Sequence, residues 1–360
     1  MSDFSLENLE VITPTEGYDK QGLKRRYGSA VYFSAPMTHA SGATFRQMIR
    51  MAMGQEDDRY VGYTQMYGAD AIIHNEALRT AMIRSVLPTE RVMLQLCGKD
   101  PASFIEALQI IKGSQLEPSI IGIDINLGCP ASCASSRHYG LYVSRDWPLV
   151  YTIISSAVKL ALFPITCKIR PLTTPEETAD YLYLLYCSGV AGVTLHMRHT
   201  TRPGHKAQSI RPCCEEIVSI LALMKKRHPN AFDLDGRLKL WLTLNGGIKG
   251  RAEADLLLST LPIDGVMVGV GFLKSPYCLS KISPPTSWIL VAEQYLDLYE
   301  EIRDTPSYLD GCTVIPAASF KEVTQHVMKL VQNVNKRYNV PLSTAKTIAE
   351  VRDILRGSSS

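Results

Sequence analysis

The feature of this chain that most constrains its fold is the alternation of short apolar segments with longer helix-like segments. Eight apolar runs occur, at Ala30–Ala35, Ala71–Ile73, Val92–Leu96, Ile120–Ile125, Ile165–Ile169, Gly192–Leu195, Leu240–Leu244 and Gly265–Val268. Runs that are apolar throughout, without a polar residue at every second position, are typical of parallel strands covered on both faces. Eight strand-then-helix units predict an α/β fold of the TIM (β/α)8 barrel type.

A doubly wound sheet fits the chain less well than a barrel does. Such a sheet needs about five or six strands and favours a glycine-rich turn after the first one. Here Ala35-Pro36-Met37 follows the first predicted strand. We therefore expect the barrel.

The segments between the runs carry helix signals. The stretch Thr174–Glu177 (TPEE) supplies a capping residue, a proline for the first turn and two acids for the positive end of the helix dipole. Gly189 is the residue type that commonly follows the end of a helix. The most apolar long window, 148–166, is broken by a lysine and ends near a proline, so it predicts a buried helix and not a membrane span.

The pattern changes after about Pro284, where only helical periodicity remains. Trp288–Arg303, Phe320–Tyr338 and Ser343–Arg356 have apolar residues at helical spacing. We expect three parts: an N-terminal extension over 1–28, a catalytic barrel over 29–283 and a helical domain over 284–357. The last two helices are rich in lysine and arginine, which fits a solvated face as well as a functional one.

Composition places the chain among globular proteins. Its 360 residues are 46% hydrophobic and 20% charged, with a formal net charge of +3. This weak positive balance does not by itself indicate a polyanionic partner. The start, MSDFSLENLE, lacks the basic-then-apolar order of a signal peptide, so we expect a cytoplasmic protein with reduced thiols.

The nine cysteines do not follow a metal-binding pattern. Cys129 and Cys133 are four positions apart, and Cys213 and Cys214 are adjacent. Four-cysteine zinc sites ordinarily use two close pairs of cysteine ligands whose spacing differs from that of these cysteines. We therefore expect no structural metal. A nucleophilic cysteine with a histidine partner stays possible, but nothing else in the sequence supports acyl transfer.

Polar residues and glycines follow the predicted strands one after another. In order, the strand ends are Pro36-Met37, Asn75-Glu76, Gln95, Asn126-Leu127-Gly128-Cys129, Lys168-Ile169-Arg170, His196-Met197-Arg198, Asn245-Gly246-Gly247 and Gly269-Val270-Gly271. One histidine or glutamine at a strand end is often structural, but this joint placement is not a core pattern. Because barrel active sites lie at the carboxyl ends of the strands, we expect these residues to form one site.

The residue types at this site suit a flavin. Gly246-Gly247 and Gly269-Val270-Gly271 follow strands seven and eight, where barrels bind phosphate through backbone N–H groups. The amide of Gln95 can donate to and accept from a flavin ring edge. A cation such as Lys168 stabilises the charge of a reduced ring. The alternative for the glycines is that they only form tight turns.

The same residues resemble the signature of tRNA-dihydrouridine synthases. The shared motifs, in order, are APM at Ala35–Met37, QLCGKD at Gln95–Asp100, DINLGCP at Asp124–Pro130, PITCKIR at Pro164–Arg170, LHMR at Leu195–Arg198, NGG at Asn245–Gly247 and DGVMVG at Asp264–Gly269. The stretch from Pro164 to Cys214 is most similar to the eukaryotic type that modifies uridine 20 of the D-loop. The resemblance implies an FMN-bearing barrel, a helical domain, and NADPH or NADH as the reductant.

The resemblance also implies roles for individual residues. Cys129 matches the acid that protonates C5 of the uracil while reduced flavin gives hydride to C6. An ordinary thiol is largely protonated at neutral pH, so it can serve as that donor. Asn126, on the same turn, can hold the base or order the ring beside it. The matched cofactor-binding residues are Pro36, Met37, Thr38, Gln95, Lys168, His196, Asn245, Gly246, Gly247, Gly269 and Val270.

A basic segment after the sixth strand is the candidate RNA contact. HMRHTTRPGHKAQSIRP, residues 196–212, contains Arg198 and Arg202 and has no acid, and Arg137 would lie on the same face. Phosphate contacts from such residues give salt-dependent affinity without reading sequence. We expect tRNA as the partner of a monomer, with the target base flipped into the barrel and the helical domain gripping the RNA. The alternative is a solvated loop without a partner.

Two other functions stay open, and the first of them is suggested by departures from the family pattern. The family usually has small residues after the cysteine, where this chain has Arg137-His138-Tyr139, and often has arginine where Val270 stands. A catalytically silent relative that only binds tRNA is therefore one alternative. The other is an FMN barrel that reduces a free pyrimidine-like small molecule.

Overall fold

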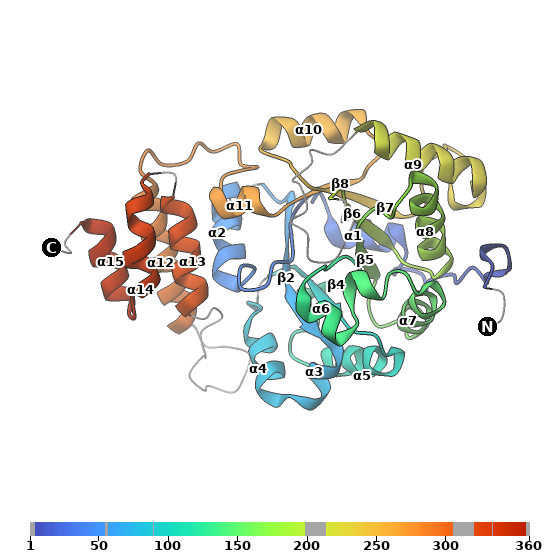
Figure 1. Cartoon of the computed structure of the whole chain (residues 1–360), viewed down its shortest axis with the longest axis horizontal. Helices are drawn as coiled ribbons and strands as arrows, with labels where there is room; N and C mark the ends of the chain where they lie inside the picture. Colours follow the sequence, from blue (N-terminus) through green and yellow to red (C-terminus); the bar gives the residue numbers. More distant parts are fainter. Residues whose placement is uncertain are drawn as a thin grey trace.

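Eight parallel strands form a closed barrel in the computed structural model, which describes residues 4–54, 57–88, 90–198, 214–304, 320–332 and 334–357. The strands are β1 (Tyr32–Ser34), β2 (Tyr60–Gly68), β3 (Val92–Cys97), β4 (Ile120–Asn126), β5 (Ile165–Ile169), β6 (Gly192–His196), β7 (Trp241–Asn245) and β8 (Gly265–Val268). Each strand pairs with the next one in the sequence, and β8 closes the barrel on β1. The predicted barrel fold is confirmed (Figure 1).

The second predicted strand was wrong. Ala71–Ile73 lies inside helix α3 (Ala69–His74), and the true second strand is Tyr60–Gly68. That strand is aromatic-rich but contains glycine, threonine and glutamine, so it does not read as a continuous apolar run. Consequently Asn75 does not end a strand: it caps α4 (Glu76–Arg84), where its side chain accepts a hydrogen bond from the backbone N–H of Leu78.

Helices surround the barrel as the alternating pattern predicts. The remaining elements of this layer are α2 (Ala43–Met53), α5 (Pro101–Lys112), α6 (Ser132–Arg137), α7 (Trp147–Lys159), α8 (Pro175–Cys187), α9 (Cys214–Arg227), α10 (Arg251–Thr260), α11 (Val270–Lys274) and the short 3-10 turns Leu6–Asn8, Glu117–Ser119, Gly140–Tyr142 and Pro229–Ala231. The side chain of Thr174 caps α8, and Gly189 beyond that helix has a φ of +84°. Among the described residues, no helix is long and apolar enough to cross a membrane.

The N-terminal helix α1 (Lys20–Tyr27) contributes to the interior of the barrel. Leu23 and Tyr27 are fully buried and belong to the cluster of inward-facing barrel residues. The ring of Tyr27 lies 4.8 Å from that of Phe33 at β1 and 5.0 Å from that of Trp241 at the start of β7, measured between centroids. Because α1 packs among residues near the amino ends of the strands, the carboxyl ends are where a ligand can enter.

The C-terminal part consists of helices that pack on one side of the barrel (Figure 1). They are α12 (Trp288–Asp304), α13 (Phe320–Val331), α14 (Asn339–Thr344) and α15 (Ile348–Arg356), with a 3-10 turn at Lys336–Tyr338. The ring of His326 stacks on Phe45 of α2 at 4.4 Å, and a Glu322 oxygen accepts a hydrogen bond from the Gly42 N–H at 2.9 Å. These contacts fix α13 against the start of α2.

Candidate active site

The carboxyl ends of β3 to β7 bring five of the predicted residues into one region. Gln95 lies within the fully buried β3, two residues before its end, Asn126 ends β4, and Lys168 is the register partner of Asn126 on β5. His196 and Asn245 are register partners at the ends of β6 and β7. The Lys168 Nζ donates a hydrogen bond to Asn245 Oδ1 at 2.9 Å. The expectation that these strand ends meet is therefore confirmed by their geometry, while their roles stay predictions.

A chain of side-chain hydrogen bonds joins β4, β3 and the loop that carries the candidate acid. Gln95 donates through Nε2 to Asp124 Oδ2 at 2.7 Å and accepts through Oε1 from Asn126 Nδ2 at 2.9 Å. Asn126 Oδ1 accepts from the backbone N–H groups of Gly128 and Cys129 at 3.2 and 3.0 Å. Asn126 therefore shapes the turn that presents Cys129. Asp124 and Thr166, whose hydroxyl donates to Asp124 at 2.7 Å, were not predicted as site residues.

The loop after Cys129 is built on a close backbone contact. The Leu141 N–H donates to the Cys129 carbonyl at 3.1 Å, and Gly140 has a φ of +62°. A Cβ placed on Gly140 would lie 2.9 Å from that carbonyl oxygen, so only glycine fits without displacing Cys129.

Of the bulky residues of this loop, Tyr139 packs inward, whereas Arg137 and His138 are exposed. Tyr139 is buried in a small cluster with Cys97 and Ala134, and its hydroxyl lies 3.2 Å from Cys133 Sγ. Burial raises the pKa of Cys97 to about 12, which keeps that thiol protonated. Arg137 lies at the end of α6, so the tyrosine is accommodated by the cluster while the arginine is exposed.

Positive charge is concentrated at the strand ends. Burial lowers the pKa of Lys168 to about 7, although the nearby Asp124 carboxylate opposes the shift. Burial lowers the pKa of Arg170 to about 10, and the charge of Arg198 adds to this. Burial and the charge of Lys168 hold the pKa of His196 well below its usual range. An anionic ligand would relieve this accumulation of cations.

Arg170 also holds the backbone around the site. Its Nε donates to the Gly128 carbonyl at 2.7 Å, and one of its terminal nitrogens donates to the Arg198 carbonyl at 3.0 Å. The loops after β4 and β6 are therefore tied together through a residue at the end of β5. The hydrogen bond from Arg170 to the Arg198 carbonyl thus holds the backbone of Arg198, a predicted substrate contact, beside the candidate site.

The glycines at the ends of β7 and β8 approach neighbouring side chains closely. Gly246 and Gly247 have φ values of +125° and +65°, and a Cβ on Gly246 would lie 3.4 Å from the His196 ring. A Cβ on Gly269 would lie 3.3 Å from Ala35 and 3.4 Å from the sulfur of Met37. These segments leave bare backbone beside the cations, and backbone N–H groups of this kind can bind an anion.

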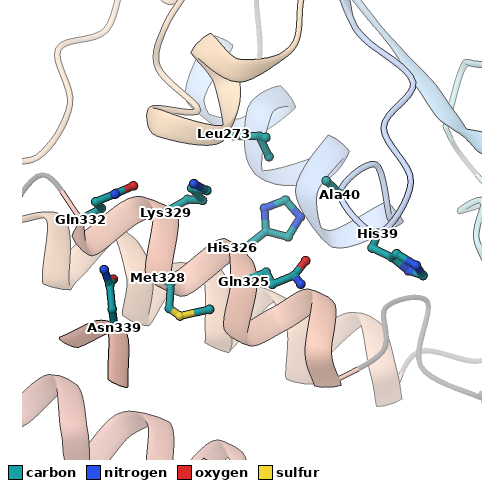
Figure 2. A pocket seen from close by; sticks show the side chains of 9 residues that line it. All are labelled: His39, Ala40, Leu273, Gln325, His326, Met328, Lys329, Gln332 and Asn339. Carbon is teal, nitrogen blue, oxygen red and sulfur yellow. The ribbon is translucent and has the colours of Figure 1, made fainter. Parts of the chain in front are cut away.

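A cavity of about 410 Å³ lies between the loop after β1, α11 and the C-terminal helices. Figure 2 shows its lining, which is made up of His39, Ala40, Leu273, Gln325, His326, Met328, Lys329, Gln332 and Asn339. The described lining residues include amide and basic side chains, and the Glu322 carboxylate lies 3.8 Å from the Nε2 of His326. His326 is 2% exposed, and its Nε2 has no hydrogen-bond partner among the described residues. Apart from Lys329, which was noted only as part of a basic helix, sequence reasoning did not identify these residues.

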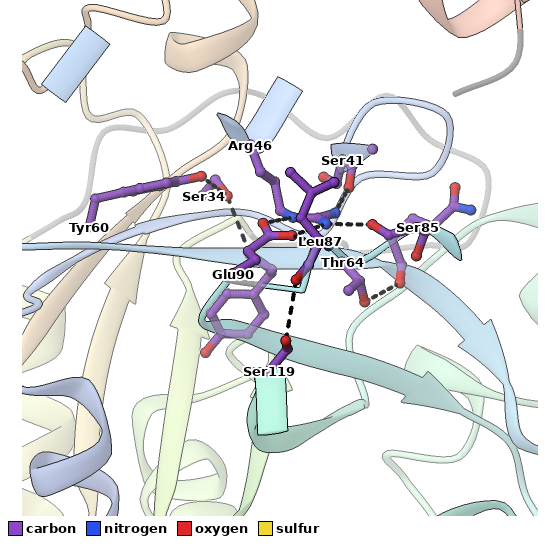
Figure 3. Close-up of polar contacts among 12 residues, drawn as sticks. Ser34, Ser41, Arg46, Tyr60, Thr64, Ser85, Leu87, Glu90 and Ser119 are labelled. Atoms are coloured by element: carbon purple, nitrogen blue, oxygen red, sulfur yellow. Dashed lines mark hydrogen bonds and ion pairs between the residues drawn. The ribbon is translucent and has the colours of Figure 1, made fainter. Parts of the chain in front are cut away.

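A buried arginine fixes the loop after β1, which carries the predicted residues Pro36, Met37 and Thr38. Arg46 of α2 is 1% exposed and forms a two-pronged ion pair with Glu90, at 2.5 and 2.7 Å (Figure 3). It also donates to the backbone carbonyls of Ser41 and Ser85. The Ser41 hydroxyl in turn accepts from the Met37 N–H at 2.9 Å and donates to the Ala35 carbonyl at 3.0 Å.

Other predicted contacts are placed differently or lie outside the described part of the chain. Arg202 and most of the basic segment after β6 fall within 199–213, which the structure does not describe. In the C-terminal helices, Arg352 pairs with Glu293, Asp297 and Glu300, so this cation serves the packing of α12 on α15. Val270 is 64% exposed at the start of α11. Over the residues that the structure describes, no cluster of three or more potential metal ligands occurs.

Comparison with known proteins identifies a family. The family model described as "Dihydrouridine synthase (Dus)" matches residues 33–350. A tRNA-dihydrouridine(16/17) synthase [NAD(P)(+)] from Schizosaccharomyces pombe is 24% identical over 321 residues, 88% of this chain and 71% of that protein. A tRNA-dihydrouridine(16/17) synthase [NAD(P)(+)]-like protein from Mus musculus is 26% identical over 334 residues, 92% of this chain and 63% of that protein.

A bacterial relative is named for a different pair of positions. A tRNA-dihydrouridine(20/20a) synthase from Synechocystis is 26% identical over 253 residues, 69% of either chain. The names of the relatives thus divide between two classes of uridine position. These names do not distinguish the uridine-20 type from the 16/17 type, so the expected likeness to the uridine-20 type stays a prediction.

Proposed function

The chain belongs to the dihydrouridine synthase family, and on that premise we propose that it reduces a uridine of tRNA to 5,6-dihydrouridine, using FMN and NAD(P)H. The observation that carries this proposal is the meeting of a cysteine turn and a cluster of cations at the open end of the barrel. Asn126 forms part of the Cys129 turn, and Lys168 beside it reaches across to Asn245. The Cys129 turn can therefore supply a proton, while Lys168 stabilises negative charge.

The residues at the strand ends fit a bound flavin. Gln95, Lys168 and His196 would contact the ring. Two glycine-containing segments, Asn245–Gly247 and Gly269-Val270, together with Pro36-Met37-Thr38, would hold the sugar-like chain and the phosphate. FMN, when bound there, supplies the hydride that the uracil accepts at C6.

Cys129 acts as the proton donor in this proposal. Its thiol gives a proton to C5 of the uracil, and the resulting thiolate regains a proton from water after the product leaves. Hydride at C6 and a proton at C5 together account for the two electrons and two hydrogens of the reduction. The backbone of Cys129 is held by Asn126 on one side and by the Leu141 N–H on the other, so the thiol has a defined position.

We propose that tRNA lies across the strand ends and the C-terminal helices. Arg137 ends α6 after β4, Arg198 follows β6, and Lys329 lines the cavity in Figure 2 together with amide side chains. Phosphates bind such cations, and the target base must leave its stack to reach the barrel. Arg202 is proposed to extend this surface, with the chain acting as a cytoplasmic monomer.

An absorption spectrum of the purified protein tests the cofactor assignment. We expect a flavin spectrum that bleaches when NADPH or NADH is added anaerobically. Bleaching without any need for RNA, followed by reoxidation with free uracil or dihydropyrimidine-type substrates only, would favour a small-molecule reductase. A colourless protein that does not take up added FMN, yet binds tRNA, would instead favour a catalytically silent relative and would contradict the proposal.

A further inference from the structure

A fully buried carboxylate inside the barrel has no part in the chemistry proposed above. Asp124 lies on β4 and is 0% exposed. Its Oδ1 accepts a hydrogen bond from the Thr166 hydroxyl at 2.7 Å, and its Oδ2 accepts one from Gln95 Nε2 at 2.7 Å. An ionised carboxylate can only accept hydrogen bonds, so the direction of both bonds is set by Asp124.

The hydrogen bond to Asp124 fixes the orientation of the Gln95 amide, and Gln95 in turn fixes the orientation of the Asn126 amide. Because Gln95 turns its nitrogen toward Asp124, its oxygen faces Asn126 Nδ2, at 2.9 Å. Because Asn126 turns its nitrogen toward Gln95, its oxygen faces the backbone N–H of Cys129, at 3.0 Å. An amide can reverse its oxygen and nitrogen, but a reversal of Gln95 would set donor against donor at Asn126. Asp124 is the member of the chain that cannot reverse.

We infer that Asp124 is a positioning residue, which orients Gln95 and Asn126 and through them holds closed the turn that carries Cys129. Each oriented amide keeps a second N–H, which it can offer only as a hydrogen-bond donor; Gln95 is 0% exposed, whereas Asn126 is partly exposed. The groups they would meet are acceptors such as the carbonyl oxygens of a flavin or a uracil ring. This last consequence rests on the proposed function, whereas the orientation itself does not.

The environment of Asp124 disfavours its charged carboxylate. Burial raises the pKa of Asp124 to about 6, although hydrogen bonds from Gln95 and Thr166 and the charge of Lys168 oppose the shift. A buried carboxylate therefore carries a desolvation penalty that an apolar residue at this position in the barrel would avoid. Orientation of the two amides is a function that an apolar residue could not perform.

Hydrogen exchange at the Cys129 amide in the flavin-free protein tests the inference. Asp124→Leu removes both acceptor oxygens and keeps the branched shape and the number of heavy atoms, and we expect exchange of the Gly128 and Cys129 amides to become about tenfold faster. Asp124→Asn keeps one oxygen for Gln95 and should change exchange by less than about threefold. Thr166→Val removes only the hydrogen bond that does not lead to Cys129, so it is the matched control with unchanged exchange.

A double-mutant cycle shows whether Asp124 acts through Gln95. Gln95→Leu alone should accelerate exchange at Cys129 as much as Asp124→Leu does, and the double variant should add little to either. Additive effects, or wild-type exchange at Cys129 in a folded Asp124→Leu protein, would overturn the inference. Where circular dichroism shows that Asp124→Leu is unfolded, wild-type exchange in Gln95→Leu overturns it equally.

The experiment is independent of the proposed enzyme activity. It uses protein without flavin and without tRNA, so a chain that makes no dihydrouridine can still pass it. The midpoint potential of bound FMN gives a second reading: Asp124→Leu should shift it, and Thr166→Val should not. If the exchange rates change as expected but the protein binds no FMN, the positioning role of Asp124 is supported and the proposed function is contradicted.

Discussion

Lys168 at the end of β5 and Asn245 at the end of β7 are joined by a 2.9 Å hydrogen bond that passes over the intervening strand β6. Asn245 is itself fixed, because its Nδ2 donates to the Met267 carbonyl on β8 at 2.8 Å. The cation that would stabilise a reduced flavin is therefore held by an amide and not by a carboxylate. Its charge stays available to a ligand.

Lys168→Met should weaken flavin binding. We expect the affinity for FMN to fall by about tenfold or more, because hydrogen bonds to charged groups contribute about 1.5–3 kcal/mol. The midpoint potential of any bound FMN should become more negative, since the reduced ring loses its cation. Fluorescence titration measures the affinity, and Lys159→Met, on the exposed side of α7, is the control. Equal affinity in the two variants would contradict the assignment of Lys168.

Cys129→Ala should separate the two half-reactions. We expect FMN to remain bound and to be reduced by NADPH at the wild-type rate, while dihydrouridine formation falls by about 10²- to 10⁴-fold, as for loss of a general acid. Cys133→Ala is the matched control, because Cys133 contacts the Tyr139 hydroxyl and has no assigned part in the reaction. Anaerobic flavin spectra and nucleoside mass spectrometry measure the two steps. Wild-type dihydrouridine formation in Cys129→Ala would remove the cysteine from the mechanism.

Asp124 should make stability depend on pH between about 4 and 6. Its pKa is raised to about 6 in the folded protein, against about 3.9 when unfolded. The folded state therefore binds more protons in this window, so the free energy of unfolding falls as pH rises, by at most about 3 kcal/mol. Of the groups that interact with Asp124, Lys168 is a cation here, and Tyr27, Tyr63 and Cys167 stay neutral.

The comparison that checks this dependence is urea unfolding of wild type and Asp124→Asn at a series of pH values. The stability of wild type relative to the variant should decrease from pH 4 to pH 6 and then level off. A difference that is flat across this range would show that Asp124 is not shifted upward.

Glu90→Ala should destabilise the loop after β1. The substitution leaves the Arg46 guanidinium buried without its ion-pair partner, which we expect to lower the free energy of unfolding by about 3 kcal/mol. Glu117→Ala removes an exposed pair with Lys112 and should cost less than about 1 kcal/mol. Denaturant unfolding measures both. Similar losses in the two variants would mean that the buried pair in Figure 3 contributes no more than a surface pair.

Seven of the eight strands could be predicted because parallel barrel strands are buried on both faces and read as apolar runs. The second strand could not, because Gly62, Thr64 and Gln65 interrupt its apolar pattern. The Ala71–Ile73 run was chosen in its place and folds as part of a helix. The packing of α1 into the barrel was also missed, since Leu23 and Tyr27 lie in a basic segment with little apolar character.

The candidate site was predictable where a residue's chemistry stands out at a strand end, as for Gln95, Lys168, His196 and Asn245. Asp124 was missed because it lies within a strand, although a lone acid in an otherwise apolar run was a usable signal. The cavity between barrel and helices could not be predicted, because His39 and His326 are far apart in the sequence and meet only through tertiary packing.

The central claim is tested most directly by anaerobic mixing of the NADPH-reduced protein with tRNA that lacks dihydrouridine. We expect the flavin to reoxidise only when the tRNA is present and one uridine to gain two hydrogens for each flavin oxidised, as read by mass spectrometry. Reoxidation by free uracil but not by tRNA, or a tRNA that returns with unchanged mass while the flavin stays reduced, would contradict the account.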